Sequence, residues 1–247
     1  MAILAEYHKP QTVTEAVQLL RRTDARLRPL AGGSQLVGAL ETRALPDVDG
    51  VVDLAGLGLQ RILATGDLLR LGATATLSDV GNHPVAGEVA SGILRRTARY
   101  EGPVNLRNAA TVGGVVATAE ADSEFYAALL ALGASVVTSD GARETITSLD
   151  EFVIPSSHHL IVSITLRVAE YRAGHARIAR TPSDRCSVAA VAVIGDGVER
   201  VALCGVGERP RLAGGALTPP DDWRGSAAYR TAMAKIVQER ALAEARG

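Results

Sequence analysis

Apolar positions in the first part of the chain fall into short runs bounded by glycines and capping residues. Thr12 stands three residues before Glu15, which is the spacing of a helix capping box, and apolar residues follow at 17, 19 and 20. The apolar run 27–31 ends in a pair of glycines, after which helical spacing begins at Leu36. The pattern predicts a helix, then a strand, a glycine loop and a second helix.

The middle of the chain alternates β-type runs with helical stretches. The β-branched run 51–54 predicts a strand, and the stretch 61–73, which is broken by a Gly-Asp pair, predicts a hairpin. A helical rhythm runs through 84–100 and stops at a Gly-Pro pair. A further helix is expected to begin at Asp122, as its N-cap, and to end at Gly133.

The last part of the chain carries longer β runs and a closing helix. The β runs lie at 160–168, 187–194 and 198–206. The last two runs meet at Asp196-Gly197, a strong hairpin signal, and a helix is predicted over 226–245. Because the pattern changes near Pro155, we expect an α+β fold with a first domain, 1–155, and a second domain, 156–247.

Two glycine loops are the candidate ligand-binding features. The first, Ala31-Gly32-Gly33-Ser34-Gln35-Leu36, places backbone N–H groups and a hydroxyl between a strand and a helix, where a phosphate can bind. Taken alone, it is also what a plain turn with positive φ requires. The second loop combines the hydroxyl of Thr111 with Gly113 and Gly114. Two such loops suit a diphosphate better than one.

Composition narrows the classes of partner. The net charge is −1, from 26 basic and 27 acidic side chains, and aromatic residues make up 3%. This balance argues against nucleic acid and anionic membranes as partners. The start of the chain lacks the apolar run of a signal peptide, and no later run has the length of a bilayer span. We therefore expect a cytoplasmic protein without membrane insertion.

Motifs for metal binding and catalysis are missing from the sequence. Cys186 and Cys204 are far apart and form neither a zinc nor an iron–sulfur pattern, so we expect them to be reduced and buried. The first glycine loop lacks the last glycine of a nucleophile elbow, and no Gly-Lys-Ser/Thr of a P-loop occurs. The five histidines are scattered. We expect neither a metal site nor catalytic side chains in this chain.

The order of these motifs resembles the FAD-binding medium subunits of the molybdenum hydroxylase family, the xanthine dehydrogenase and aerobic carbon monoxide dehydrogenase group. The similarity runs over nearly the whole chain. Its marks are the first glycine loop, Leu71 to Thr76, Leu106-Arg107-Asn108 leading into Thr111-Val112-Gly113-Gly114, Asp122 before the run 129–134, and Trp223 to Arg230.

The resemblance implies a fold and a set of cofactor-binding residues. The fold is a two-lobed FAD-binding region of the p-cresol methylhydroxylase type, with lobes at about 1–53 and 54–155, followed by a C-terminal antiparallel sheet with a helix. Contacts to FAD are implied for Ala31, Gly32, Gly33, Ser34, Gln35, Leu36, Ala73, Thr74, Thr76, Asn108, Thr111, Gly113, Gly114, Asp122 and Arg180. Asp122 serves equally well as a helix cap. Family members commonly carry asparagine at position 115 and lysine at 180, where this chain has valine and arginine.

The resemblance also implies partners. A small subunit with [2Fe-2S] clusters supplies electrons that left the substrate at a molybdenum centre on a large subunit, and the flavin passes them to an external acceptor. A dimer of heterotrimers is the implied assembly. Two other functions remain open: an assembly subunit that has lost FAD, and a free-standing flavin oxidase, for which no general base stands out beside the loops.

Overall fold

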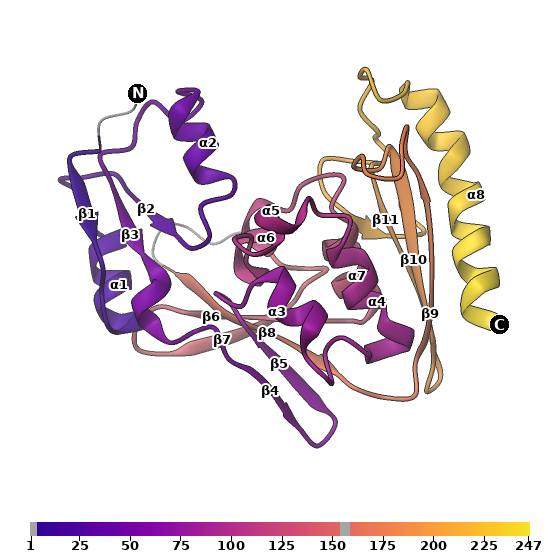
Figure 1. Ribbon diagram of the computed structural model, residues 1–247, viewed down its shortest axis with the longest axis horizontal. Coiled ribbons are helices and arrows are strands. Elements are labelled where there is room, and N and C mark those ends of the chain that lie inside the picture. The colour runs from indigo at the N-terminus through magenta and orange to yellow at the C-terminus, as the bar shows by residue number, and fades with distance from the viewer. Residues whose placement is uncertain (1–3, 154–158) are drawn as a thin grey trace.

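The computed structural model describes residues 4–153 and 159–247, and its described residues form three sheets with surrounding helices (Figure 1). The N-terminal lobe holds a parallel sheet in the order β1-β3-β2. Its elements are β1 (Glu6–His8), α1 (Val13–Leu20), β2 (Leu27–Leu30), α2 (Leu36–Glu41), β3 (Gly50–Asp53) and the 3-10 helix η1 (Leu54–Leu57).

The first helix, α1, begins where its capping residues predict. The Thr12 hydroxyl accepts a hydrogen bond from the N–H of Glu15 at 3.2 Å, and the Glu15 carboxylate accepts one from the N–H of Gln11 at 3.0 Å. Ala16, Val17 and Leu20 bury the inner face of the helix. The predicted order of helix, strand, glycine loop and helix is confirmed in this lobe.

The central region is built on an antiparallel sheet in the order β4-β5-β8-β6-β7. Its strands are β4 (Ile62–Thr65), β5 (Leu68–Gly72), β6 (Ser135–Ser139), β7 (Glu144–Ser148) and β8 (Leu160–Arg167). Its helices are α3 (Leu77–Asn82), α4 (Val89–Ala98), α5 (Val104–Arg107), α6 (Val112–Thr118) and α7 (Glu124–Ala131). The predicted β4-β5 hairpin is confirmed.

The run 160–168 was expected in the C-terminal sheet, and this expectation is wrong. β8 pairs with β5 and β6 in the central sheet instead. The predicted domain boundary at Pro155 lies within 154–158, outside the described residues. The division into domains stays a prediction, and the pairing of β8 favours placing the boundary after Arg167.

Two helix boundaries in the central region differ from the prediction. The N-cap of α7 is Ser123, whose hydroxyl accepts from the N–H of Tyr126 at 3.1 Å, so the prediction of Asp122 as the cap is wrong. The side chain of Asp122 pairs with arginines instead. In the stretch 84–100, α4 begins only at Val89, and residues 90–92 have left-handed φ values of 47°, 58° and 76°.

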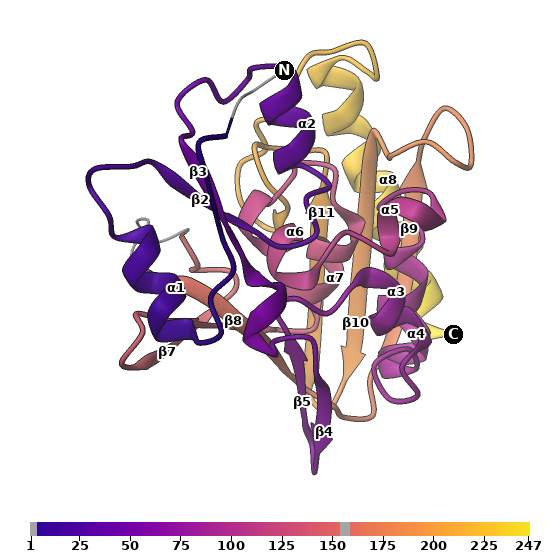
Figure 2. The same ribbon diagram turned by 60° about the vertical axis from the view of Figure 1, so that its left-hand side comes forward.

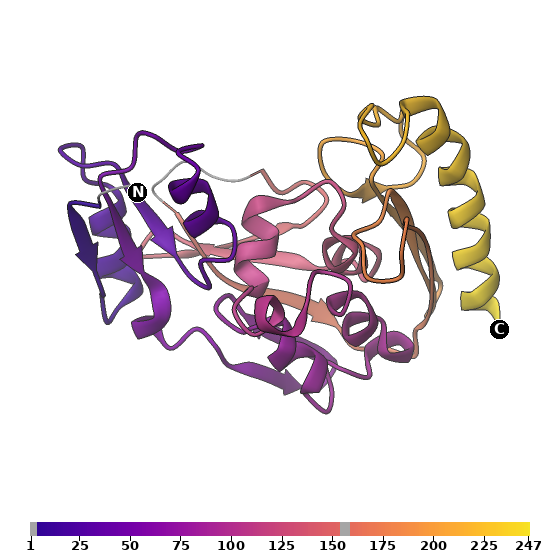
Figure 3. The ribbon, with the colours of Figure 1, turned by 45° about the horizontal axis from the view of Figure 1, so that its top comes forward.

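The C-terminal part is a meander in the order β12-β11-β10-β9 with one long helix (Figure 3). Its elements are β9 (Arg172–Ile178), β10 (Val188–Gly195), β11 (Val198–Cys204), β12 (Arg211–Leu212) and α8 (Ala227–Arg246). The hairpin across Asp196-Gly197, the closing helix and the α+β class are confirmed. β9 is absent from the predicted elements.

Strand β10 explains how this sheet is covered on both faces. Its side chains alternate, so that Ala190 and Ala192 pack against α8, whereas Val191 and Val193 join the core that contains α4 and α7. The predicted run was continuously apolar because both faces of the strand are buried.

Within the described residues, no helix has the length and apolar character needed to cross a bilayer. The cytoplasmic location stays a prediction.

Candidate functional site

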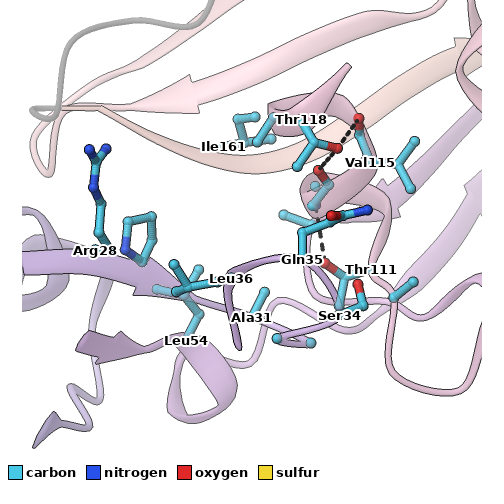
Figure 4. A pocket seen from close by; sticks show the side chains of 18 of the residues that line it. Arg28, Ala31, Ser34, Gln35, Leu36, Leu54, Thr111, Val115, Thr118 and Ile161 are labelled. Atoms are coloured by element: carbon cyan, nitrogen blue, oxygen red, sulfur yellow. Dashed lines mark hydrogen bonds between the residues drawn. The ribbon is translucent and has the colours of Figure 1, made fainter. Parts of the chain in front are cut away.

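A cavity of about 350 Å³ lies between the N-terminal lobe and the central region, and both glycine loops line it (Figure 4). In Figure 2 the N-terminal lobe comes forward, and the chain between β2 and α2 passes beside α6. Such a volume is typical of small-molecule sites. The two loops that the sequence singled out therefore form one site.

The first glycine loop approaches the central region backbone to backbone. A Cβ atom at Gly32 would lie 1.6 Å from the carbonyl oxygen of Ala109, and Gly33 has φ of 72°. Among the described residues, no protein acceptor receives a hydrogen bond from the N–H groups of Gly32, Gly33, Ser34 or Gln35. The loop thus offers N–H donors at the cavity wall, which is the arrangement that an anion requires.

The second glycine loop is held firmly from behind. The N–H of Gly113 donates to the carbonyl of Ala73 at 2.8 Å, and the hydroxyl of Thr111 accepts from the N–H of Gly114 at 3.1 Å. Thr111 is the N-cap of α6, and the side chain of Thr118 donates back to the carbonyl of Gly114 at 3.1 Å. These bonds fix the position of α6 against the residues that follow β5.

Charged side chains gather at one end of the cavity. Glu101, Glu120 and Arg185 line it there. The Arg185 guanidinium lies 3.0 Å from the carboxylate of Glu101, 3.4 Å from that of Glu120 and 2.8 Å from that of Asp122. Glu101 also accepts hydrogen bonds from the hydroxyl of Ser123 at 2.8 Å and from the N–H of Phe125 at 2.9 Å. This end is therefore ordered and carries both signs of charge.

Burial and charge shift the pKa values of these groups. Burial opposes ionisation of Asp122, but Arg185 and Arg224 outweigh it and hold the pKa of this carboxyl below its usual value. Burial likewise disfavours the charged form of Arg185, and Glu101 and Asp122 outweigh it, so the pKa of Arg185 lies above its usual value. Burial raises the pKa of Glu101, against the opposing charge of Arg185.

The remaining walls of the cavity are mostly apolar. They come from α1, β2, η1 and the start of β8, through Leu20, Leu27, Pro29, Leu54, Leu160 and Ile161. Arg28 and His159 are the charged or polar side chains among the residues of this region. The site therefore combines the N–H donors of the first glycine loop with apolar walls, which suits a ligand that has both an anionic and an apolar part.

Most of the predicted site residues meet at this cavity. Those that line it are Ala31, Gly32, Gly33, Ser34, Gln35, Leu36, Ala73, Thr111, Gly113 and Gly114. Val115, one of the two departures from the family pattern noted in the sequence, also lines the cavity. Their binding roles stay predictions.

The other predicted site residues lie outside the cavity lining. Thr76 caps α3 in a capping box with Asp79, and Asn108 accepts a hydrogen bond from Ser78 at 2.5 Å. The guanidinium of Arg180 lies 5.3 Å from the centre of the Trp223 ring. Asp122 does not line the cavity, but its carboxylate pairs with Arg185, which does. Thr74 follows the lining residue Ala73 in the chain.

Sequence reasoning missed the charged residues Glu101, Glu120 and Arg185. Each stands in a loop without a motif, and nothing local indicates that segments so far apart in the chain converge.

Within the described residues, no group of three or more His, Cys, Asp or Glu side chains could hold a metal ion.

Comparisons with known proteins identify the family of the chain. A family model described as FAD binding domain in molybdopterin dehydrogenase matches residues 3–166. The carbon monoxide dehydrogenase medium chain of Afipia carboxidovorans is 26% identical over 98% of this chain and 96% of the relative. The glyceraldehyde dehydrogenase medium chain of Sulfolobus acidocaldarius is 26% identical over 96% of this chain and 97% of the relative.

Solved structures give the same fold. Chains in quinoline 2-oxidoreductase from Pseudomonas putida 86 and in carbon monoxide dehydrogenase from Oligotropha carboxidovorans superpose with a TM-score of 0.89. The sequence identity is 24%, and the match covers 100% of this chain and 99% of each of those chains.

Proposed function

The chain belongs to the family of FAD binding domains in molybdopterin dehydrogenases, as a medium subunit of the molybdenum hydroxylase type, and we propose that it carries electrons through FAD within such a complex. Its cofactor is FAD, and it is an oxidoreductase subunit. The transfer of electrons from iron–sulfur clusters on a partner chain to an external acceptor is the proposal.

The meeting of the two glycine loops at one cavity carries the proposal. The N–H groups of residues 32–35, which have no protein acceptor among the described residues, suit the diphosphate of FAD. The backbone approach of Gly32 to Ala109 leaves no room for a side chain between the loops. The residues present thus fit the cofactor, and this fit argues against the alternative of an assembly subunit without FAD.

We assign binding roles to the predicted residues accordingly. The first loop and the Thr111 to Gly114 loop hold the diphosphate, and Ala73 with the adjacent Thr74 forms part of the cofactor's surroundings. Thr76, Asn108, Asp122 and Arg180 lie outside the cavity lining, and their proposed roles are to support the residues that line it. FAD, when bound, supplies electron transfer in steps of one or two electrons. Such chemistry needs no acid or base from this chain.

We propose the partners by the same reasoning. Relatives named as medium chains belong to carbon monoxide and glyceraldehyde dehydrogenases. A large subunit with the molybdenum cofactor and a small subunit with [2Fe-2S] clusters are therefore the expected partners, in a dimer of heterotrimers. Neither nucleic acid nor membrane insertion enters this proposal.

The experiment is to purify the chain with its partners, release the cofactor by denaturation and identify it as FAD or FMN. Rapid mixing of the complex with substrate, without oxygen, then follows the flavin absorption. About one FAD per chain and flavin reduction at or above the turnover rate are expected. A complex that turns over without flavin, or whose flavin stays oxidised during turnover, would contradict the proposal.

A further inference from the structure

A side-chain hydrogen bond joins the two lobes at the cavity. The amide Nε2 of Gln35, in the first glycine loop, lies 2.6 Å from Oε1 of Glu120, in the loop that follows α6. Both residues line the cavity, and Figure 4 shows the side chain of Gln35 beside α6. A bond between a neutral amide and a carboxylate is of the stronger, charge-assisted kind.

The carboxylate of Glu120 is itself held in place. Arg185 lies 3.4 Å from it and is anchored in turn by Glu101 and Asp122, at 3.0 and 2.8 Å. The side chain of Arg185 is 23% exposed and that of Glu120 is 36% exposed. Arg185 therefore fixes Glu120 from the central region, and Glu120 presents one oxygen to the N-terminal lobe.

This contact differs from the backbone approach of the first glycine loop to Ala109. Gly32 meets Ala109 through the backbone, so that contact opens only if the main chain moves. The bond between Gln35 and Glu120 joins two partly exposed side chains and opens by rotation of either one. Of the two contacts, it is the one that can break without rearranging the loops.

We propose that Gln35, Glu120 and Arg185 form a clasp that retains FAD in its site. Gln35 and Glu120 are positioning residues that hold the first glycine loop against the loop after α6 at the cavity, and Arg185 holds Glu120 within reach of Gln35. The inference rests on the proposed cofactor site. It predicts that breaking the clasp raises the rate of FAD release.

Simple electrostatics predicts the opposite sign for one variant. A carboxylate near an anionic diphosphate repels it, so Glu120→Ala should slow FAD release if charge alone matters. The clasp predicts that Glu120→Ala speeds release, because the bond between Gln35 and Glu120 at the cavity is lost. The direction of the change therefore separates the two explanations.

The experiment measures FAD release from the purified complex by flavin fluorescence after dilution. In Gln35→Glu, two carboxylates face each other across the contact, and we expect release about tenfold faster, which corresponds to about 1.4 kcal/mol. Adding Glu120→Gln in the same chain restores an amide–carboxylate pair with its partners exchanged. This double variant should return to within about threefold of the unmodified complex.

Two controls complete the test. Gln18 is exposed on α1, away from the cavity lining, and Gln18→Glu makes the same change of charge there, so it should leave the release rate unchanged. The thermal midpoint of each FAD-free variant reports whether it folds. If Gln35→Glu does not fold, Gln35→Ala replaces it, with faster release again expected.

The outcomes separate the clasp from the proposed function. A double variant as fast as Gln35→Glu, or a Glu120→Ala variant slower than the unmodified complex, would overturn the clasp while FAD binding stands. A complex of the unmodified chain that holds no FAD would overturn the proposed function and the clasp together.

Discussion

Glu124, the first residue of α7, forms a buried ion pair with Arg177 of β9, with 3.0 Å between Oε1 and Nε. The side chains are 1% and 13% exposed. Nε2 of His175 lies 2.6 Å from the other carboxylate oxygen, and the Arg177 guanidinium lies 4.1 Å from the centre of the Tyr100 ring. The pair thus joins the core helix of the central region to the C-terminal sheet.

The substitution Glu124→Gln tests how much this ion pair contributes. It removes the anion and leaves the cation of Arg177 buried without its partner, so we expect the free energy of unfolding to fall by about 3–5 kcal/mol. Unfolding in urea, followed by circular dichroism, measures the change. Glu199 pairs with Arg246 at 3.1 Å with both side chains at least 50% exposed, and Glu199→Gln should cost less than about 1 kcal/mol. Equal losses in both variants would contradict the assignment.

Asp122 should make stability depend on pH on the acid side. Because Arg185 and Arg224 hold the pKa of Asp122 below its usual value, its contribution is complete above about pH 3.9 and is lost as pH falls through the lower pKa of the folded state. We expect Asp122→Asn to lower the free energy of unfolding by about 1–2 kcal/mol at pH 7. Urea midpoints at pH 7 and pH 3 should show this difference shrinking at pH 3. A difference that stays constant would exclude the ion pairs as its source.

The elements that sequence reasoning predicted correctly carry local signals. Thr12 marks the start of α1, and Asp196-Gly197 marks the hairpin of β10 and β11. The pairing of β8 carries no such signal, because a strand's partners are decided by the packing of distant segments. The strand β9 was missed since its charged residues find partners, such as Glu124, only in the folded chain.

The candidate site likewise has a part that local sequence signals predict and a part that they do not. The glycine loops were recognisable because close backbone approach and free N–H groups require particular residues in a short stretch. The charged end was not, since Glu101, Glu120 and Arg185 converge only through the fold. Asp122 was assigned from its place before a helix, and Ser123 takes the cap because its hydroxyl reaches the N–H of Tyr126.

The two cysteines should be unreactive in the folded protein. Their Sγ atoms lie 3.5 Å apart, and both residues are buried, as the sequence predicted. The hydrogen bond with Cys204 and burial raise the pKa of Cys186. In Cys204 the hydrogen bond with Cys186 lowers the pKa, but burial together with the nearby carboxylates of Glu124, Glu101 and Asp122 outweighs it and raises the pKa as well. A thiol-reactive dye at pH 8 should label the folded chain at least about 100-fold more slowly than the unfolded chain. Fast labelling of the folded chain would contradict this prediction.

Gly32 should tolerate no side chain, whereas Gly38, six residues along the chain, should tolerate alanine. A Cβ atom at Gly32 would lie 1.6 Å from the carbonyl oxygen of Ala109, while nothing lies within 4 Å of one at Gly38 in α2. In Gly32→Ala the loops must separate, which we expect to cost about 1–3 kcal/mol of stability and most of the bound flavin. In Gly38→Ala we expect full flavin content and a gain of up to about 1 kcal/mol, because alanine favours the helix.

Flavin content per chain and urea midpoints measure both effects at Gly32 and Gly38. The two substitutions add the same methyl group to the same short segment, so they differ in what that group meets. If Gly32→Ala kept its flavin and Gly38→Ala lost it, α2 rather than the backbone contact with Ala109 would govern the site. If Gly32→Ala lost stability but kept its flavin, the backbone contact between Gly32 and Ala109 would support the fold without contributing to flavin binding. The N–H groups of the first loop would then need another role.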